Sequence, residues 1–486
     1  MRSFAFATAL AAIGAVTASP TPSEQDPPTK RANFPVVSVS GNAFYKDKDR
    51  FYVRGIDYQP GGSSANEDPL GDTDVCLRDI AKFKDLGVNT IRVYAVDNSL
   101  NHDKCMQALQ DAGIYLVLDV NNPKYSINRA EPGPSYNAKY LQSVFATVEQ
   151  FAAYPNTLAF FSGNEVINDE KGTDKAAPYV KAVTRDMKNY MNSRGLRRVP
   201  VGYSAADVSK NRMQTAMYMN CGSDDARSDF FAFNDYSFCN SNFKESGWDQ
   251  KVKNFTDYGI AILWVFFSLG SLALPRPRST LTPLTLWNVP NSLSEFGCIL
   301  NRPRKFAEIA ALMSTEMTSV YSGGMMYEYS YEANEYGIVK IDSLKAKTVT
   351  ETDEYANFKA ALKDNPSPSG NGGAASTTHA VSCPAMGDDW QVNPSLIPEM
   401  PAQAQQYMKN GAGKGPGLDL DGKGSQNAGD SGTSTASVTG GQASPTSSNG
   451  KKTDNAGPAT LGPLDKAPLL VTGLTLIFTL FGTLLL

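Results

Sequence analysis

The chain has 486 residues, with 45 Lys and Arg against 49 Asp and Glu, and its formal net charge is −4. This balance implies no basic surface, so nucleic acid is not expected as a partner. Only two His occur, His102 and His379, and they do not form a ligand-like cluster. This argues against a zinc site built on His and against nucleophilic catalysis by His, and carboxylates are expected to carry any chemistry.

The N-terminal segment has the composition of a signal peptide. Arg2 precedes an apolar run, and residues 15–18 read "AVTA", the small residues that precede a cleavage site. We expect residues 1–18 to be a signal peptide, and a buried first helix is the alternative.

Short apolar or β-branched runs then alternate with helical patterns, and the helical stretch 74–86 ends before Gly87. The runs that predict strands are 51–58, 90–96, 115–120, 157–165, 199–204, 230–236, 292–297 and 323–330. The stretches that predict helices are 74–86, 101–112, 137–153, 175–193 and 304–320. Eight such strands indicate an α/β fold, a (β/α)8 TIM barrel over residues 19–365. A doubly wound sheet would need a glycine-rich phosphate turn, which we do not find.

In such barrels the active site lies at the carboxyl ends of the strands. The fourth run ends in Glu165 and the seventh in Glu295, and a retaining glycosidase needs two such carboxylates, about 5–5.5 Å apart. Other polar residues at strand ends are Asp57, Gln59, Arg92, Tyr94, Asp119, Asn164, Asn234, Tyr236, Tyr327 and Glu328. Two of them have structural alternatives, because Arg92 could form an ion pair with Asp57 and Asp119 could cap a loop.

The six Cys suit an oxidising compartment, and none forms a CxxC pair. We expect three disulfides, and the sequence alone leaves fifteen pairings open. Asn254 begins an N-glycosylation sequon, Asn-Phe-Thr.

The composition shifts toward Gly, Ser, Thr, Pro, Asn and Ala after about residue 365. We expect residues 366–390 to be tied to the barrel through Cys383, and residues 391–455 to be a disordered linker. Residues 456–486 end in an apolar stretch without a basic tail, which is typical of a glycosylphosphatidylinositol (GPI) attachment signal. Asn455 is the expected attachment site and Asn449 its rival, while a membrane-spanning tail anchor is the alternative. These features predict a secreted protein held at an outer surface, at the outer membrane leaflet through a GPI anchor.

Several motifs together resemble the fungal β-1,3-glucanosyltransferases of glycoside hydrolase family 72, in the shorter subfamily without a cysteine-rich carbohydrate-binding module. The resemblance covers about residues 34–415 and rests on "YVRGIDYQPGG", "LGVNTIRVYAVD", "YLVLDVNNP", "FFSGNEVIND", "LSEFGC" and "SGGMMYEYS". It implies Glu165 as the acid/base and Glu295 as the nucleophile, with no cofactor or metal.

The resemblance also implies sugar-binding or supporting roles, which fall on Gln59, Tyr94, Asp119, Asn164, Tyr236 and Tyr327. It implies the disulfides Cys76–Cys105, Cys221–Cys383 and Cys239–Cys298. The partners would be β-1,3-glucan donor and acceptor chains. A hydrolytic β-1,3-glucanase with the same two Glu is the alternative activity.

Residues 260–288 depart from the family pattern, in which the two flanks almost meet. The apolar part, 260–274, is short for a membrane span and is followed by Pro275 and Pro277. We interpret this segment as a translated intron or gene-model error. If it is a true part of the protein, it precedes the strand of Glu295 and could leave a non-catalytic wall protein.

Overall fold

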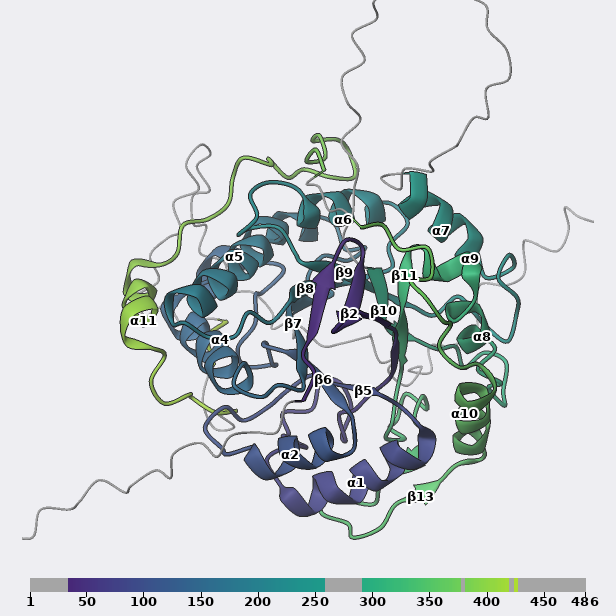
Figure 1. Ribbon diagram of the computed structural model, residues 1–486. Helices are drawn as coiled ribbons and strands as arrows, with labels where there is room; N and C mark the ends of the chain where they lie inside the picture. Colours follow the sequence, from purple (N-terminus) through teal and green to yellow (C-terminus); the bar gives the residue numbers. More distant parts are fainter. Residues whose placement is uncertain (1–33, 258–290, 377–380, 419–423, 427–486) are drawn as a thin grey trace, which may run out of the picture. The chain divides into compact units, whose positions relative to one another are not determined.

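The computed structural model describes residues 34–257, 291–376, 381–418 and 424–426. Eight parallel strands close into a barrel in the order β10-β11-β4-β5-β6-β7-β8-β9, with helices around it (Figure 1). These strands are β4 (Val53–Asp57), β5 (Thr90–Val93), β6 (Tyr115–Asp119), β7 (Thr157–Asn164), β8 (Val201–Ala206), β9 (Phe230–Asp235), β10 (Asn291–Phe296) and β11 (Tyr321–Met326). Each overlaps one of the eight predicted runs, so the predicted barrel is confirmed.

The helices pack their apolar faces on the barrel. In α1, the Asp72 carboxylate accepts hydrogen bonds from the N–H groups of Asp74 and Val75, and Gly87 ends the helix with a φ of 79°. The larger helices are α1 (Thr73–Leu86), α2 (Asp103–Asp111), α4 (Ala138–Phe151), α5 (Ala177–Ser193), α6 (Arg212–Asn220), α7 (Trp248–Asp257) and α10 (Asp353–Asp364). The shorter elements are α3 (Pro132–Ser135), η1 (Thr173–Ala176), β12 (Val339–Lys340) and β13 (Thr350–Glu351). The sequon residue Asn254 lies half-buried on α7, and its glycosylation stays a prediction.

The continuous helix predicted over 304–320 is wrong. The structure forms two short helices there, α8 (Glu308–Leu312) and α9 (Thr315–Thr318). Between them Ser314 is extended, with φ −82° and ψ 158°, and its hydroxyl donates to the Ala311 carbonyl at 2.7 Å. The side chain thus satisfies a carbonyl at the end of α8, and the chain turns before α9 begins.

A three-stranded antiparallel sheet that the sequence analysis did not predict covers the amino end of the barrel. Its strands are β1 (Val37–Ser40), β2 (Ala43–Lys46) and β3 (Asp49–Phe51), drawn in purple in Figure 1. The Phe44 ring lies 5.4 Å from that of Phe230, and the Phe51 ring lies 5.1 Å from that of Tyr115. Phe230 and Tyr115 are the first residues of β9 and β6, so this small sheet closes the amino end of the barrel. The carboxyl end remains open for a functional site.

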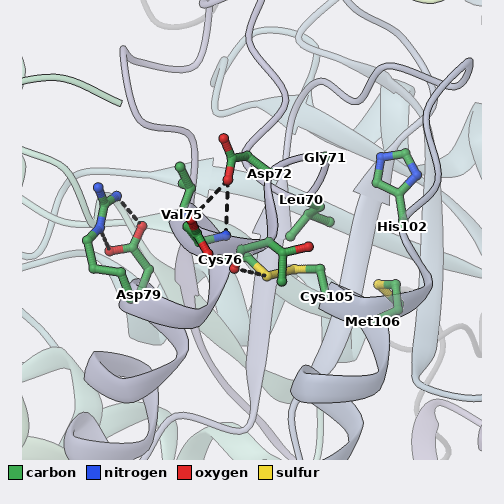
Figure 2. Close-up of a disulfide and its surroundings, with 12 residues drawn as sticks. Leu70, Gly71, Asp72, Val75, Cys76, Asp79, His102, Cys105 and Met106 are labelled. Carbon is green, nitrogen blue, oxygen red and sulfur yellow. Dashed lines mark hydrogen bonds and ion pairs between the residues drawn. A yellow bond between two sulfur atoms is a disulfide. The ribbon is translucent and has the colours of Figure 1, made fainter. Parts of the chain in front are cut away.

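Three disulfides join the barrel's outer elements, and they are the pairs that the resemblance implied. Figure 2 shows the bond between α1 and α2, next to the carboxylate of Asp72 that caps α1. A second bond ties the segment after β9 to the segment after β10, and a third ties the C-terminal segment to the end of α6. The pairs are Cys76–Cys105, Cys239–Cys298 and Cys221–Cys383.

The linker boundary predicted at residue 391 is wrong, because residues 391–418 and 424–426 lie against the barrel. They contain η2 (Ala402–Ala404) and α11 (Gln405–Asn410), which lies outside α4 and α5 in Figure 1. The Tyr407 ring packs 6.4 Å from that of Phe145, and the Ala412 N–H donates to the Tyr190 hydroxyl at 2.8 Å. This segment has too few apolar residues to form a core of its own, and its contacts with α4 and α5 hold it in place.

Several predicted segments lie outside the described residues. They are the signal peptide 1–18, the segment 260–288, the linker residues 427–455, the attachment residue Asn455 and the propeptide 456–486. Within the described ranges, no helix is both long and apolar enough to cross a membrane.

Candidate active site

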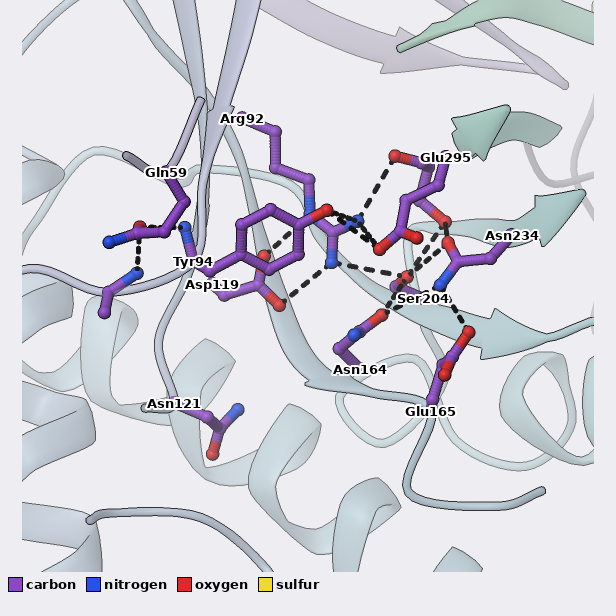
Figure 3. Close-up of polar contacts among 12 residues, drawn as sticks. Gln59, Arg92, Tyr94, Asp119, Asn121, Asn164, Glu165, Ser204, Asn234 and Glu295 are labelled. Atoms are coloured by element: carbon purple, nitrogen blue, oxygen red, sulfur yellow. Dashed lines mark hydrogen bonds and ion pairs between the residues drawn. The ribbon is translucent and has the colours of Figure 1, made fainter. Parts of the chain in front are cut away.

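Glu165 and Glu295 lie at the carboxyl end of the barrel, as the sequence predicted (Figure 3). Glu165 directly follows β7 and has a φ of 47°, a left-handed conformation that is rare outside Gly. Two contacts hold it: its N–H donates to the Ser204 carbonyl at 2.8 Å, and its carbonyl accepts from Arg129 Nη2 at 2.8 Å. The backbone strain is thus maintained by neighbours and aims the side chain into the site.

Three donors surround the fully buried carboxylate of Glu295 on β10. Oε1 accepts from the Tyr94 hydroxyl at 2.8 Å and from Arg92 Nη1 at 3.0 Å. Oε2 accepts from the Tyr236 hydroxyl. An ionised carboxylate can accept all of these hydrogen bonds at once, and they fix the orientation of both oxygens.

Asn234 on β9 connects the two Glu. It is the register partner of Glu295 across the β9–β10 ladder, and its Nδ2 donates to Glu165 Oε1 at 2.7 Å. Its Oδ1 accepts from the Ser294 hydroxyl at 2.9 Å. Ser204 on β8 donates to Asn164 Oδ1 at 2.6 Å and contacts Ser294 Oγ at 2.9 Å. This network, seen between the Glu side chains in Figure 3, places both carboxylates in one site.

The two Glu sit in different electrostatic surroundings. Burial, and then the charge of Glu295, raise the pKa of Glu165 to about 7, against the lowering effect of the Asn234 hydrogen bond. Glu165 therefore holds a proton in a large share of molecules at neutral pH, while Glu295 faces a guanidinium and two hydroxyls.

Arg92 does not pair with Asp57, so that structural alternative is wrong. Its Nε donates to Asp119 Oδ2 at 2.8 Å and its Nη2 to Asp119 Oδ1 at 3.2 Å, while Nη1 reaches Glu295. Asp119 is accordingly a bidentate partner of Arg92, and the structure gives it this contact in place of the loop cap considered above. The Arg92 guanidinium thus contacts both carboxylates, and its bonds to Asp119 fix it where it can donate to Glu295.

The other predicted site residues differ in burial and in the contacts that they make. Asn164 is half-buried beside Glu165, and the Tyr327 hydroxyl donates to Ser63 Oγ at 3.2 Å. Gln59 is fully buried; its Oε1 accepts from the N–H groups of Tyr94 and Ala95 at 3.2 and 3.1 Å. Gln59 therefore supports the backbone that carries Tyr94, behind the surface that a sugar would reach.

Sequence reasoning missed Ser204 and Ser294 and did not assign Asn234 a role. Ser204 lies in the fifth predicted run, whose polar end was a usable signal. Asn234 was noted as a polar strand end, but its role and that of Ser294 could not be predicted, because their partners come from neighbouring strands and depend on register.

A cleft of roughly 610 Å³ opens beside Glu165 and is continuous with solvent. Its walls come from the segments that follow β4, β5, β6 and β7, and they include Ser63, Ser64, Tyr94, Asp119, Asn121, Asn122, Pro123, Ser126, Ile127 and Asn164. Eight of the thirteen lining residues carry a hydroxyl or a side-chain amide, which suits a ligand rich in hydroxyl groups. Among the residues that the structure describes, no three His, Cys, Asp or Glu are grouped to hold a metal ion.

Asp57 lies at the end of β4, near the charged groups of the site. It is fully buried, and neither carboxylate oxygen has a hydrogen-bond partner. Burial raises the pKa of Asp57 well above its usual value; Arg92 opposes this, and the charges of Glu295, Glu328 and Asp119 add to it. Asp57 should therefore keep its proton to a higher pH in the folded protein than in the unfolded chain.

We expect Asp57→Asn to gain stability over the wild type as pH rises from 4 to 7. The folded pKa exceeds the unfolded one, so the wild type loses stability as pH rises above the unfolded value, whereas Asn has no proton to lose. Urea unfolding at pH 4, 5.5 and 7 measures the difference. Asp85→Asn is the control with opposite sign, because hydrogen bonds from Lys359 and Tyr355 lower the pKa of Asp85. A free-energy difference for Asp57→Asn that shrinks toward pH 7 would contradict a raised pKa of Asp57 in the folded protein.

Comparison with known proteins places this site in a family. The sequence profile of the glycoside hydrolase 72 family, described as glucanosyltransferase, matches residues 28–284 and 278–365. The two stretches overlap inside the segment 260–288. The 1,3-beta-glucanosyltransferase gel1 of Aspergillus fumigatus is 55% identical over 413 residues, which cover 85% of this chain and 83% of gel1. The 1,3-beta-glucanosyltransferase GAS5 of Saccharomyces cerevisiae is 46% identical over 398 residues, 81% of this chain and 75% of GAS5.

A solved structure agrees with the sequence matches. A mutant of Saccharomyces cerevisiae Gas2p in complex with laminaritetraose and laminaripentaose aligns with a TM-score of 0.65 and 33% identity, over 76% of each chain. The two Glu at the carboxyl end of a closed barrel, the profile match and these identities all point to one family. The chain belongs to the glucanosyltransferase family, glycoside hydrolase family 72.

Proposed function

We propose that this protein is a 1,3-beta-glucanosyltransferase that acts by a retaining mechanism, with Glu295 as nucleophile and Glu165 as acid/base. The observation that carries the assignment is the linked pair itself. One Glu has a pKa that desolvation raises to about 7, and the other is held by three donors. This is the division of roles that a retaining glycosidase needs.

In the first step Glu295 attacks the anomeric carbon of an internal β-1,3-linked glucose. Glu165 gives its proton to the departing glycosidic oxygen, and the fragment with the original reducing end leaves. The new bond joins the sugar to Glu295, whose negative charge is consumed. Arg92 and the two Tyr keep the attacking oxygens oriented for this step.

In the second step Glu165, now ionised, takes the proton from the 3-hydroxyl at the non-reducing end of another glucan. That oxygen attacks the anomeric carbon, and Glu295 leaves as a carboxylate. The acceptor gains the transferred chain, so glucan is elongated. Asn164, beside the acid/base, is proposed to bind the sugar 2-hydroxyl, a contact that strengthens in the transition state.

The composition of the first 18 residues and of residues 456–486 bears on where in the cell the protein acts. We propose secretion after removal of residues 1–18, and attachment at Asn455 through a GPI anchor to the outer leaflet of the plasma membrane and the cell wall. The composition of residues 456–486 supports this proposal. Release of the protein from cells by a phosphatidylinositol-specific phospholipase would test it.

Product analysis tests the activity. The chain without residues 456–486 is incubated with a reduced β-1,3-gluco-oligosaccharide, and products are sized by chromatography and mass spectrometry. Products longer than the substrate are expected. Only shorter products would instead mean a hydrolytic glucanase.

The segment 260–288 needs its own arm of this experiment. The same incubation is run with residues 260–288 deleted, and the transcript is sequenced across these codons. Elongation only after deletion would mean that the segment is incompatible with the active barrel. Mature transcript that retains the codons would overturn the interpretation as an intron or gene-model error.

The pH profile should have an alkaline limb near pH 7. Glu165 must be protonated to start the reaction, so kcat/KM should fall as pH rises through its pKa of about 7. Arg129 lowers the pKa of Glu165 through its charge, so Arg129→Gln should move the limb to higher pH. Arg129→Lys keeps the charge and is the matched control. A limb that moves equally in both variants, or is absent, would contradict Glu165 as the acid.

A further inference from the structure

The described C-terminal residues contact the segments that line the cleft. We use the name clasp for residues 412–418 and 424–426. The clasp crosses the outer side of three segments that follow successive barrel strands: 58–72 after β4, 94–102 after β5, and 120–131 after β6. The same three segments supply most of the cleft wall, including Ser63, Tyr94 and Asn122.

Each segment is bound to the clasp by hydrogen bonds. Asn66 Nδ2 donates to the Leu418 carbonyl at 3.0 Å, which ties the first segment. Asn98 Oδ1 accepts from the Gly417 N–H at 2.9 Å, which ties the second. Asn98 is itself anchored, because its Nδ2 donates to the Ser143 carbonyl of α4 at 3.0 Å.

The third segment is held most closely. The Ser425 N–H donates to the Lys124 carbonyl at 2.8 Å, and the Ser425 carbonyl accepts from Asn137 Nδ2 at 2.8 Å. Ser425 is fully buried, and Gln426 Nε2 donates to the Ser126 hydroxyl. A Cβ on Gly424 would lie 2.0 Å from the Lys124 carbonyl oxygen, so the two backbones are in contact.

We propose that the clasp is a positioning element that sets the width of the glucan cleft by fixing these three segments from outside. None of its contacts touches Glu165 or Glu295, so it can act on the chemistry only indirectly, through Tyr94 and Arg129 on the segments that it holds. The cleft walls do depend on it, because short loops without regular structure keep their shape through such side-chain and backbone bonds. The identity of the ligand as a β-1,3-glucan rests on the proposed function.

Gly424→Ala tests the proposal, with Gly413→Ala as its matched control. Both Gly have positive φ, +62° and +67°, so an added Cβ strains the backbone similarly. Only at Gly424 does it meet a neighbour, since nothing lies within 4 Å of the position at Gly413. The full chain is used for both variants. Asn66→Ala, which removes only the bond to Leu418, is a second variant that should not impair folding.

The first readout is hydrogen–deuterium exchange, which needs no activity. In Gly424→Ala, amides of residues 120–131 should exchange roughly 5- to 10-fold faster than in Gly413→Ala, as expected for the loss of one or two hydrogen bonds. Asn66→Ala should show a smaller increase in residues 58–72. Equal exchange in Gly424→Ala and Gly413→Ala would overturn the clasp.

The second readout is the KM for β-1,3-gluco-oligosaccharides, which should rise about fivefold in Gly424→Ala while kcat stays within about twofold. Faster exchange with an unchanged KM would overturn the role in the cleft. If the wild type turns over no glucan, the proposed function fails, and the exchange experiment still decides whether the clasp fixes these segments.

Discussion

Glu295→Gln is expected to lower the rate of glucan elongation by roughly 10⁴-fold or more, the scale seen when a covalent nucleophile is removed. Gln keeps the length and much of the hydrogen bonding of Glu295, but its amide cannot form the glycosyl ester. A 2-fluoro donor with a good leaving group measures this directly, since it should trap the wild-type enzyme as an adduct on the peptide that contains Glu295. No adduct should form in Glu295→Gln.

Glu328→Gln is the matched control. Glu328 is also a buried Glu near the barrel's carboxyl end, and burial raises its pKa to about 8, so it is mostly protonated at pH 6. Its Oε1 accepts from Asn334 Nδ2 at 2.7 Å, a bond that the carbonyl of Gln can also accept. Activity of this variant should stay near that of the wild type. An adduct on Glu328, or full activity of Glu295→Gln, would refute Glu295 as the nucleophile.

Glu165→Gln is expected to lower elongation by roughly 10²- to 10⁴-fold, the usual contribution of a general acid/base. The loss should depend on the leaving group. A donor that carries dinitrophenolate needs no protonation to form the glycosyl-enzyme, so its first step should be nearly normal. The second step should be slow, because no base activates the acceptor.

Added azide tests this split, since it needs no base and should release β-glucosyl azide from Glu165→Gln. Glu170→Gln, an exposed position five residues along the same chain segment, is the control and should behave as the wild type does. If azide gives no product, or if both leaving groups lose rate equally, the acid/base role of Glu165 is wrong.

The short apolar and β-branched runs predicted the barrel strands, because whether a strand is buried shows in the residues of that strand alone. The Glu at the ends of β7 and β10 could be located in the same way, since a strand that runs from the buried barrel into its mouth changes from apolar to polar residues at that point. Gly87 at the end of α1 and Asp72 at its start are likewise local signals. The roles of Gln59 and Arg92 were not local, because each is set by residues on other strands.

The contacts of the clasp and the hydrogen bonds of the active site could not be predicted from sequence patterns. Residues 412–426 are rich in Gly and polar side chains and predicted no ordered contacts, but the amides of Asn66, Asn98 and Asn137 satisfy their backbone groups. Ser314 likewise broke a helix that periodicity alone would continue.

The sequence by itself determined the eight strands, most of the helices and the two Glu, since these depend on burial patterns and residue chemistry along a short stretch of chain. The tertiary structure alone decided that Arg92 pairs with Asp119 and Glu295, that Asn234 joins the two Glu, and that the C-terminal residues contact the segments that line the cleft. Those contacts join residues 27 to 352 positions apart, and strand register and barrel closure bring them together.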